Sequence, residues 1–199
     1  MAIVYTWPGW APNAFEMRVI PNFTTFTSTY TKDTQVLDFL GERWMCKFDL
    51  PNDTDTVLAG AREAFFDRLR GPVNLIALWN LRRPVPQGTL RGSPTVSGAV
   101  AQLANLLNIQ STAGATLRAG DHIGIGSQMV RVLVDAVADG SGLFTAVEFT
   151  PRARLGISSG TGITWYRPSA NFMLKSDSVP VVHRPGMFEG SSLDLIQVP

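Results

Sequence analysis

The chain has few of the residues on which chemistry depends. Its 199 residues include one cysteine and two histidines, and its net charge at pH 7 is +1. A single thiol cannot form an internal disulfide, and neither histidine has a second Cys or His at zinc-ligand spacing. A net charge near zero gives no general attraction to nucleic acid or to an anionic membrane. We therefore expect a protein that builds or binds, with no catalytic residue, no metal and no cofactor.

Long hydrophobic runs and a secretory signal are also missing. No stretch approaches the ~18 apolar residues of a membrane span, and residues 1–15 lack a basic region followed by an unbroken apolar stretch. We expect no membrane partner and synthesis in the cytosol. Only 17% of the residues are charged, whereas 45% are hydrophobic. Because interface cores are poor in charge and rich in aromatic residues, this composition indicates surface that is buried against partners.

Strand patterns dominate both ends of the chain. Residues 15–50 are rich in β-branched and aromatic side chains, and Pro21 and Gly41 interrupt them. A later apolar run and the last residues show the same character. The pattern predicts strands at 17–20, 23–29, 34–39, 43–50, 73–79 and 192–198.

The period becomes helical after Pro51. Apolar residues then recur at three- and four-residue spacing, which places them on one helix face that we expect to lie on a sheet. These residues are Val57, Leu58, Ala61, Phe65 and Leu69. Asp53 or Thr54 is the predicted N-cap, and Gly71-Pro72 is predicted to end the helix.

The middle of the chain predicts a small all-β unit. Between Gly120 and Pro151, polar turns separate three apolar segments at 122–125, 129–137 and 143–149. Further short strands are expected at 162–166 and 171–174. None of these segments brings titratable side chains together, so the unit offers no set of groups for catalysis.

These elements predict a mainly β fold of the β-rich α+β kind. We expect an N-terminal unit at 1–92, in which a β-sheet packs with one helix. A small β-barrel or β-sandwich unit is expected at 93–177, and a C-terminal tail at 178–199 is expected to return to the first unit. The boundary follows the proline-stiffened connector 81–88, after which the composition changes.

The lone cysteine and the first histidine lie in apolar strands. Cys46 alternates with Trp44, Phe48 and Leu50 on one strand face, so we interpret it as a buried, unreactive thiol. His122 is expected to face solvent or a partner.

Two short motifs match the start or the pattern of a functional signature, but the residues around them lack the features that the signature requires. Residues 156–160 match the G-x-S-x-G pattern around Ser158, but a strand-like sequence follows where the nucleophile turn requires a helix. Residues 124–126 begin like a dinucleotide fingerprint, yet no third glycine and no helix follow. Asp135 and Asp139 flank a turn and are interpreted as solvated acids, because a calcium site needs more oxygen ligands.

Four residues are the best candidates for an interface. Trp7 and Trp10 lie in a stiff, turn-rich segment and must either fold back on the protein or dock on a neighbour. Arg82 and Arg83 lie in the connector. The arginines of 82–154 are spread over several strands and loops without an aromatic stacking platform, so we expect salt bridges between subunits and no sequence-specific binding of nucleic acid.

The order of several short motifs resembles the distal tail proteins at the baseplate of long-tailed bacteriophages. The resemblance covers residues 41–126. The motifs are Gly41-Glu42-Arg43-Trp44, Leu50-Pro51, Leu69-Arg70-Gly71, Pro86-Gln87-Gly88-Thr89, and Ala119-Gly120-Asp121 through Ile125-Gly126.

The resemblance implies a structural protein of the virion tail tip, assembled in the host cytoplasm. Such a protein forms a ring, usually a hexamer, whose sheet-and-helix unit continues the tail tube while its barrel unit points outward. The implied partners are other copies of the chain, the tail-tube protein, and the baseplate hub, fibre or receptor-binding proteins. Closed head-to-tail contacts would also account for the shortage of charge.

Two other classes of function remain open from the residues. A carbohydrate-binding β module would use Trp165-Tyr166 as a sugar platform and would be a soluble monomer. A serine hydrolase would use Ser158 and would react with a serine-directed covalent probe.

Overall fold

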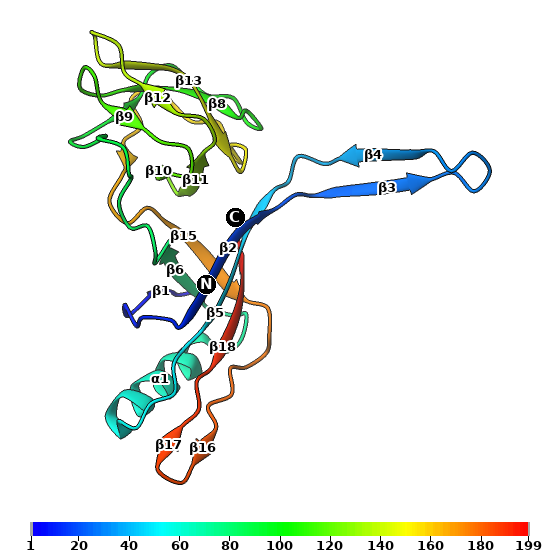
Figure 1. The fold of residues 1–199 in the computed structure, drawn as a ribbon, viewed down its shortest axis with the longest axis vertical. Helices are drawn as coiled ribbons and strands as arrows, with labels where there is room; N and C mark the ends of the chain where they lie inside the picture. Colours follow the sequence, from blue (N-terminus) through cyan, green and yellow to red (C-terminus); the bar gives the residue numbers. More distant parts are fainter. Residues whose placement is uncertain (1, 199) are drawn as a thin grey trace. The chain divides into compact units, whose positions relative to one another are not determined.

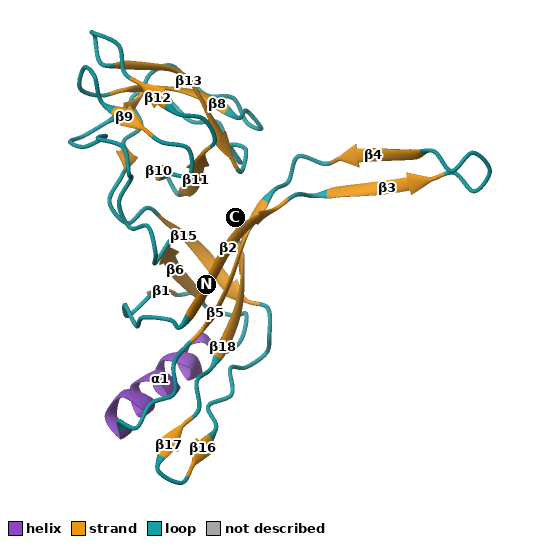
Figure 2. Ribbon diagram, viewed as in Figure 1, coloured by secondary structure: helices purple, strands orange, loops and turns teal. Residues whose placement is uncertain are grey.

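The computed structural model describes residues 2–198, which form two compact units. Unit 1 comprises Met1–Arg18, Trp44–Pro84 and Arg167–Pro199, and unit 2 comprises Val19–Arg43 and Val85–Tyr166. Strands make up 42% of the chain and the helix 7%, which confirms the predicted mainly β fold (Figures 1 and 2).

Unit 1 is built on a six-stranded sheet. The outermost strands of this sheet are β1 and β2, and the strand order is β1-β6-β15-β18-β5-β2. Their bounds are β1 Val4–Thr6, β2 Ala14–Ile20, β5 Arg43–Asp49, β6 Leu75–Trp79, β15 Ser169–Leu174 and β18 Ser192–Gln197. A short hairpin, β16 (His183–Arg184) and β17 (Met187–Phe188), turns at Pro185-Gly186 as that dipeptide predicts.

Helix α1, Thr56–Leu69, lies on one face of this sheet. Alternate residues of β5 are buried, and Trp7 joins Phe48 of this buried set to Phe65 of α1 by edge-to-face contacts of 4.9 and 5.8 Å. Cys46 is also buried, and Leu50 is buried just beyond the strand, so the predicted face of Cys46 is confirmed. On β6, β15 and β18, most residues that point the opposite way are half-buried, and they belong to the second face of the sheet.

The helix starts later and buries a different face than the sequence predicts. Its N-cap is Asp55, whose carboxylate accepts the Val57 N–H at 2.8 Å. The expected cap Asp53 accepts the Asp55 N–H and pairs with Arg62 instead. Val57 is 79% exposed.

The residues of the helix that face the sheet are Ala59, Arg62, Phe65, Phe66 and Leu69. Because one of these buried residues is Arg62, a search for apolar residues at helical spacing does not identify this face. The predicted apolar stripe was therefore wrong at its N-terminal end.

Unit 2 contains a nearly closed barrel. Its six-stranded sheet has the order β14-β10-β11-β13-β8-β7. The two end strands approach each other through a bridge between Thr95 and Gly162. The bounds are β7 Thr95–Val96, β8 Leu106–Gln110, β10 His122–Ile125, β11 Gln128–Val132, β13 Leu143–Thr150 and β14 Ile163–Thr164, with a small sheet of β9 (Thr116–Leu117) and β12 (Ala136–Val137). Large side chains such as Phe144 and Phe149 fill the interior.

A separate two-stranded sheet belongs to the early part of unit 2. Its strands β3, Phe23–Thr27, and β4, Thr34–Asp38, form an antiparallel hairpin in full register. Figure 1 shows the two strands as a ribbon in blue. We call residues 23–38 the apolar hairpin, because several of their large hydrophobic side chains are exposed.

The expected and observed boundaries differ. The barrel unit begins at Val85 and ends at Tyr166, whereas 93 and 177 were expected, and residues 19–43 also belong to unit 2. Strand β15, expected in the small β unit, pairs with β6 and β18 in the sheet of unit 1. The final strand β18 also lies in this sheet, next to β5.

Candidate functional site

The two N-terminal tryptophans fold back on unit 1. Trp7 is 2% exposed, and its indole N–H donates to the Trp10 carbonyl at 3.2 Å. Trp10 is half-buried against Phe65, with ring centroids 5.4 Å apart, and the Arg62 guanidinium lies 6.0 Å from its ring. Of the two alternatives for this segment, the structure therefore places Trp7 in the core of its own chain.

Arg82 and Arg83 remain on the surface of unit 1. Both side chains are exposed, and the carboxamide oxygen of Asn80 accepts the backbone N–H of each arginine at 3.0 and 3.1 Å. Arg82 also donates to the Asn13 carbonyl at 3.4 Å. The turn thus holds two adjacent cations outward, which suits the rim of an interface.

The apolar hairpin is an exposed hydrophobic surface that was not among the interface candidates predicted from the sequence. Large hydrophobic side chains lie exposed on both of its faces. Cross-strand pairing places Phe26 and Leu37 on one face and Phe23 and Val36 on the other. The exposed residues are Phe23, Phe26, Tyr30, Val36, Leu37 and Phe39, just past β4.

The composition of the hairpin strengthens this assignment. The stretch 22–31 carries no charge and is rich in threonine. Charges and prolines are the devices that keep exposed strand edges from pairing. An isolated two-stranded hairpin is also only marginally stable in water. The sequence signal is the uncharged, threonine-rich segment 22–31, within which residues 23–29 were predicted to form a strand.

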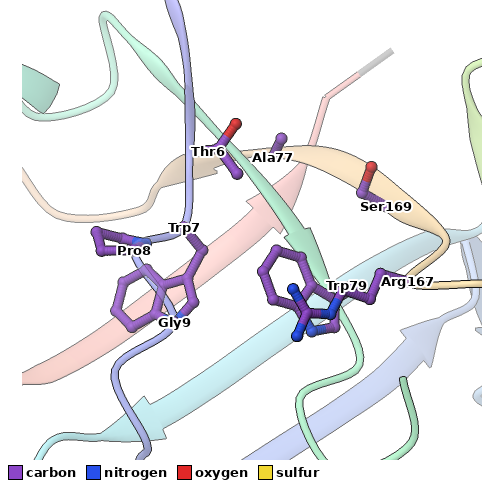
Figure 3. Close-up of a pocket in the computed structure, with 8 residues that line it drawn as sticks. All are labelled: Thr6, Trp7, Pro8, Gly9, Ala77, Trp79, Arg167 and Ser169. Carbon is purple, nitrogen blue, oxygen red and sulfur yellow. The ribbon is translucent and has the colours of Figure 1, made fainter. Parts of the chain in front are cut away.

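An open groove of about 390 Å³ lies on unit 1. It is lined by residues of β1, β6 and β15 and by the Trp7–Gly9 segment. Figure 3 shows the Arg167 guanidinium against the Trp79 ring, and the guanidinium carbon lies 5.0 Å from the ring centroid. None of the eight lining residues is a carboxylate, histidine or cysteine. The groove is therefore a concave surface with one cationic side chain, that of Arg167, and with no carboxylate or imidazole among its lining residues to act as a general acid or base.

The two histidines lie in different units of the chain. His122, expected to face solvent or a partner, is 5% exposed, because β10 lies between β11 and β14 in the barrel. That expectation was wrong. His183 lies on the β16–β17 hairpin of unit 1, where Glu63 of α1 contacts its Nε2 at 2.5 Å and Phe188 packs against its ring.

The serine and glycine motifs occupy β turns. Ser158 is exposed in the loop before β14, and its carbonyl accepts the Thr161 hydroxyl at 2.7 Å. A strand follows this loop, as predicted, so the serine lacks the strand-to-helix turn of a hydrolase nucleophile. Gly126 forms the two-residue turn of the β10–β11 hairpin with a φ of 59°.

Trp165 is covered on more than one side. It packs against the barrel core, and its indole N–H donates to the Gly92 carbonyl at 2.9 Å. The Arg91 guanidinium lies over its ring at 5.0 Å. A sugar platform needs a free aromatic face, so this geometry favours a structural role for Trp165 over a carbohydrate site.

Asp135 and Asp139 accept hydrogen bonds from their own neighbourhood. The Ala119 N–H, and then Arg118, lower the pKa of Asp135. The pKa of Asp139 is lowered by the Ser141 hydroxyl first, and then by backbone N–H groups including that of Leu143. Among residues 2–198 no group of three or more His, Cys, Asp or Glu is arranged to hold a metal ion. Both acids stabilise turns.

Several arginines of unit 2 are engaged within the chain. Arg118 forms an ion pair with Asp135 at 2.6 Å, and Arg91 donates to the carbonyls of Gly88 and Leu90. Arg152 approaches Glu42 at 4.0 Å. These contacts account for part of the local basic bias without a nucleic-acid partner.

The fold and its surfaces define a mainly β, two-unit protein with an exposed apolar surface on a hairpin. A comparison with protein-family models finds no match, and a search of curated proteins finds no significant one. In the described part of the chain, the helix is too short and too polar to cross a membrane.

Proposed function

We propose that the chain is a structural subunit of a bacteriophage tail tip. In this proposal it forms a ring, with six copies as the expected number, that joins the tail tube to the baseplate hub and receptor-binding proteins. The proposal draws on the motif order of residues 41–126 and on one structural observation. That observation is the apolar hairpin, which exposes large hydrophobic residues on both faces.

Assembly would cover the hydrophobic side chains and strand edges of the hairpin that a monomer leaves exposed to water. Complete burial of a Phe or Leu side chain contributes about 1.5–3 kcal/mol, and each of these partly exposed side chains would contribute a part of that. Two apolar faces and two unpaired strand edges require neighbours on more than one side, and a closed ring of identical subunits supplies them through head-to-tail contacts. The exposed pair Arg82 and Arg83 adds a charged rim to the same proposal.

The mass of the purified chain in solution tests the proposal. Light scattering coupled to size exclusion, with negative-stain imaging of the same fractions, is expected to show a ring of defined symmetry, alone or with tail-tube protein. The variant Phe26→Asp should shift the chain to monomers, because it buries a charge in the contact. Thr112→Asp, in an exposed loop of unit 2, is the matched control and should assemble normally.

A chain that stays monomeric at high concentration and does not co-assemble with tail-tube protein overturns the proposal. A monomer that binds glycans would favour the carbohydrate module instead.

A further inference from the structure

The sheet of unit 1 has one face that the helix does not cover. On this open face, residues from five neighbouring strands form a continuous row. Val4 pairs with Leu75, Met173 pairs with Ile196, and Ile196 pairs with Met45. The Phe172–Ile76 pair brings Met173 alongside Leu75 and completes the row. We call Val4, Leu75, Met173, Ile196 and Met45 the apolar stripe.

The five members of the stripe are uncharged and partly open to water, and at one end the Arg18 guanidinium lies 3.8 Å from the Met45 sulfur. Four of its members are half-buried, and Val4 is 47% exposed. The next row along the strands is polar, since Asp194 pairs with Lys47. Buried residues on the opposite face, such as Cys46 and Leu195, contrast with this row. The open face therefore presents a bounded apolar band instead of a general hydrophobic surface.

We infer that the apolar stripe of one copy is the docking surface for the apolar hairpin of the next copy. This inference rests on the proposed ring and names the two surfaces that would join its subunits. One chain carries both surfaces, so every copy offers one hairpin and one stripe. Such a contact is head-to-tail, and when the ring closes every stripe is paired with one hairpin.

The dimensions of the two surfaces agree. A row that crosses five strands spans four strand spacings, or about 19 Å. A five-residue strand extends about 17 Å, and both strands of the hairpin have five residues. A hairpin laid across the strands can therefore follow the whole stripe. Two packed β layers with crossed strands are a common arrangement.

The two faces of the hairpin differ in charge, and this difference decides which face can lie on the apolar stripe. Phe26 and Leu37 share their face with Thr24 and Gln35, and none of these residues is charged. On the other face Phe23 lies opposite Asp38, whose carboxylate would lose water against an apolar stripe. The Phe26 face is therefore the one that docks.

Cross-linking between two single-cysteine variants tests this contact. Phe26→Cys and Met173→Cys chains are purified separately, mixed, allowed to assemble and treated with a short bismaleimide. A dimer that contains one chain of each kind is expected. The native Cys46 is fully buried and stays unmodified. A second pair, Leu37→Cys with Ile196→Cys, provides an independent measurement of the same contact.

The matched control moves the cysteine to the other face of the hairpin. Thr25→Cys precedes Phe26 in the same strand and points to the opposite side. Mixed with Met173→Cys, it should give only background cross-linking. Assembled rings with equal cross-linking from both hairpin faces, or with none from either pair, overturn the inference and leave the proposed function standing.

Two further outcomes also decide the question. If Met173→Cys in the assembled ring cross-links only to added tail-tube protein, the occupant is that protein and the inference fails. If the wild-type chain forms no ring, alone or with tail-tube protein, the proposed function fails with it. Ring formation by the variant chains, checked by light scattering, separates these cases from a folding defect.

Discussion

The Asp121 carboxylate accepts a hydrogen bond from the Gly88 N–H at 3.1 Å, although the two residues are 33 positions apart. The same carboxylate accepts the Gln87 N–H at 2.7 Å and the Arg118 N–H at 2.8 Å. Asp121 is 2% exposed. Two motifs that looked separate in the sequence, Pro86–Thr89 and Ala119–Asp121, therefore form one buried node that fastens the connector to the barrel.

Loss of the Asp121 carboxylate should destabilise unit 2. Asp121→Ala removes the acceptor of three N–H groups, of which that of Gly88 is buried, and hydrogen bonds to a charged group contribute about 1.5–3 kcal/mol each. We expect the free energy of unfolding to fall by about 3 kcal/mol or more, measured by urea unfolding. Asp33→Ala, on the exposed hairpin loop, is the control and should change little. An equal effect of both substitutions would contradict the role of the node.

Gly88 should tolerate no side chain. A Cβ at this position would lie 2.1 Å from the Thr116 carbonyl oxygen, which is backbone and cannot rotate away. Gly88→Ala should lower stability by about 1–3 kcal/mol, as overpacked sites do. Gly140→Ala is the matched control, because nothing lies within 4 Å of its added Cβ. The thermal unfolding midpoints of the two variants are compared. Equal midpoints would show that the backbone around Gly88 moves to accommodate the added methyl group.

Cys46 should not react in the folded protein. Burial raises the pKa of its thiol, and the nearby Glu16 carboxylate raises it further. The reactive thiolate is therefore scarce across the pH range in which the protein is folded. A colorimetric thiol reagent should detect no thiol in the native chain and one per chain in denaturant. Ser127→Cys, in the exposed β10–β11 turn, should react at once. Rapid native labelling of Cys46 would mean that unit 1 opens.

Asp139 should make stability depend on pH in the acid range. Its pKa is lowered by hydrogen bonds from the Ser141 hydroxyl and from the Leu143 and Ser141 N–H groups. A carboxyl with a lowered folded-state pKa stabilises the protein above its ordinary pKa, and this contribution is lost as the pH falls through the lowered value. The stability difference between wild type and Asp139→Ala should therefore be constant at neutral pH and shrink in acid. Urea unfolding at a series of pH values measures it.

Asp139→Asn separates charge from geometry. The amide oxygen still accepts the backbone N–H groups, so part of the stability remains without titration of the side chain. A difference from wild type that does not change with pH would contradict the assigned cause of the pKa shift.

Local sequence determined most of the elements. Alternation predicted β5 and the burial of Cys46, because the side-chain period of a strand is set by neighbours in the chain. The helix was predicted, but its buried face was predicted correctly only at the C-terminal end, at Phe65 and Leu69. Arg62 is buried because Asp53 and the Pro51 carbonyl, brought there by the fold, satisfy its charge.

Tertiary structure alone decided which strands became neighbours and which surfaces stayed open. β15 lies between β6 and β18 because pairing over long sequence distances depends on the packing of the whole sheet. Residues 23–29 were predicted to form a strand, and only the fold shows that β3 and β4 form a sheet of their own, with no third strand beside them among residues 2–198. The sequence by itself determined that this chain is β-rich and poor in charge. The structure located the apolar surface that this composition leaves exposed.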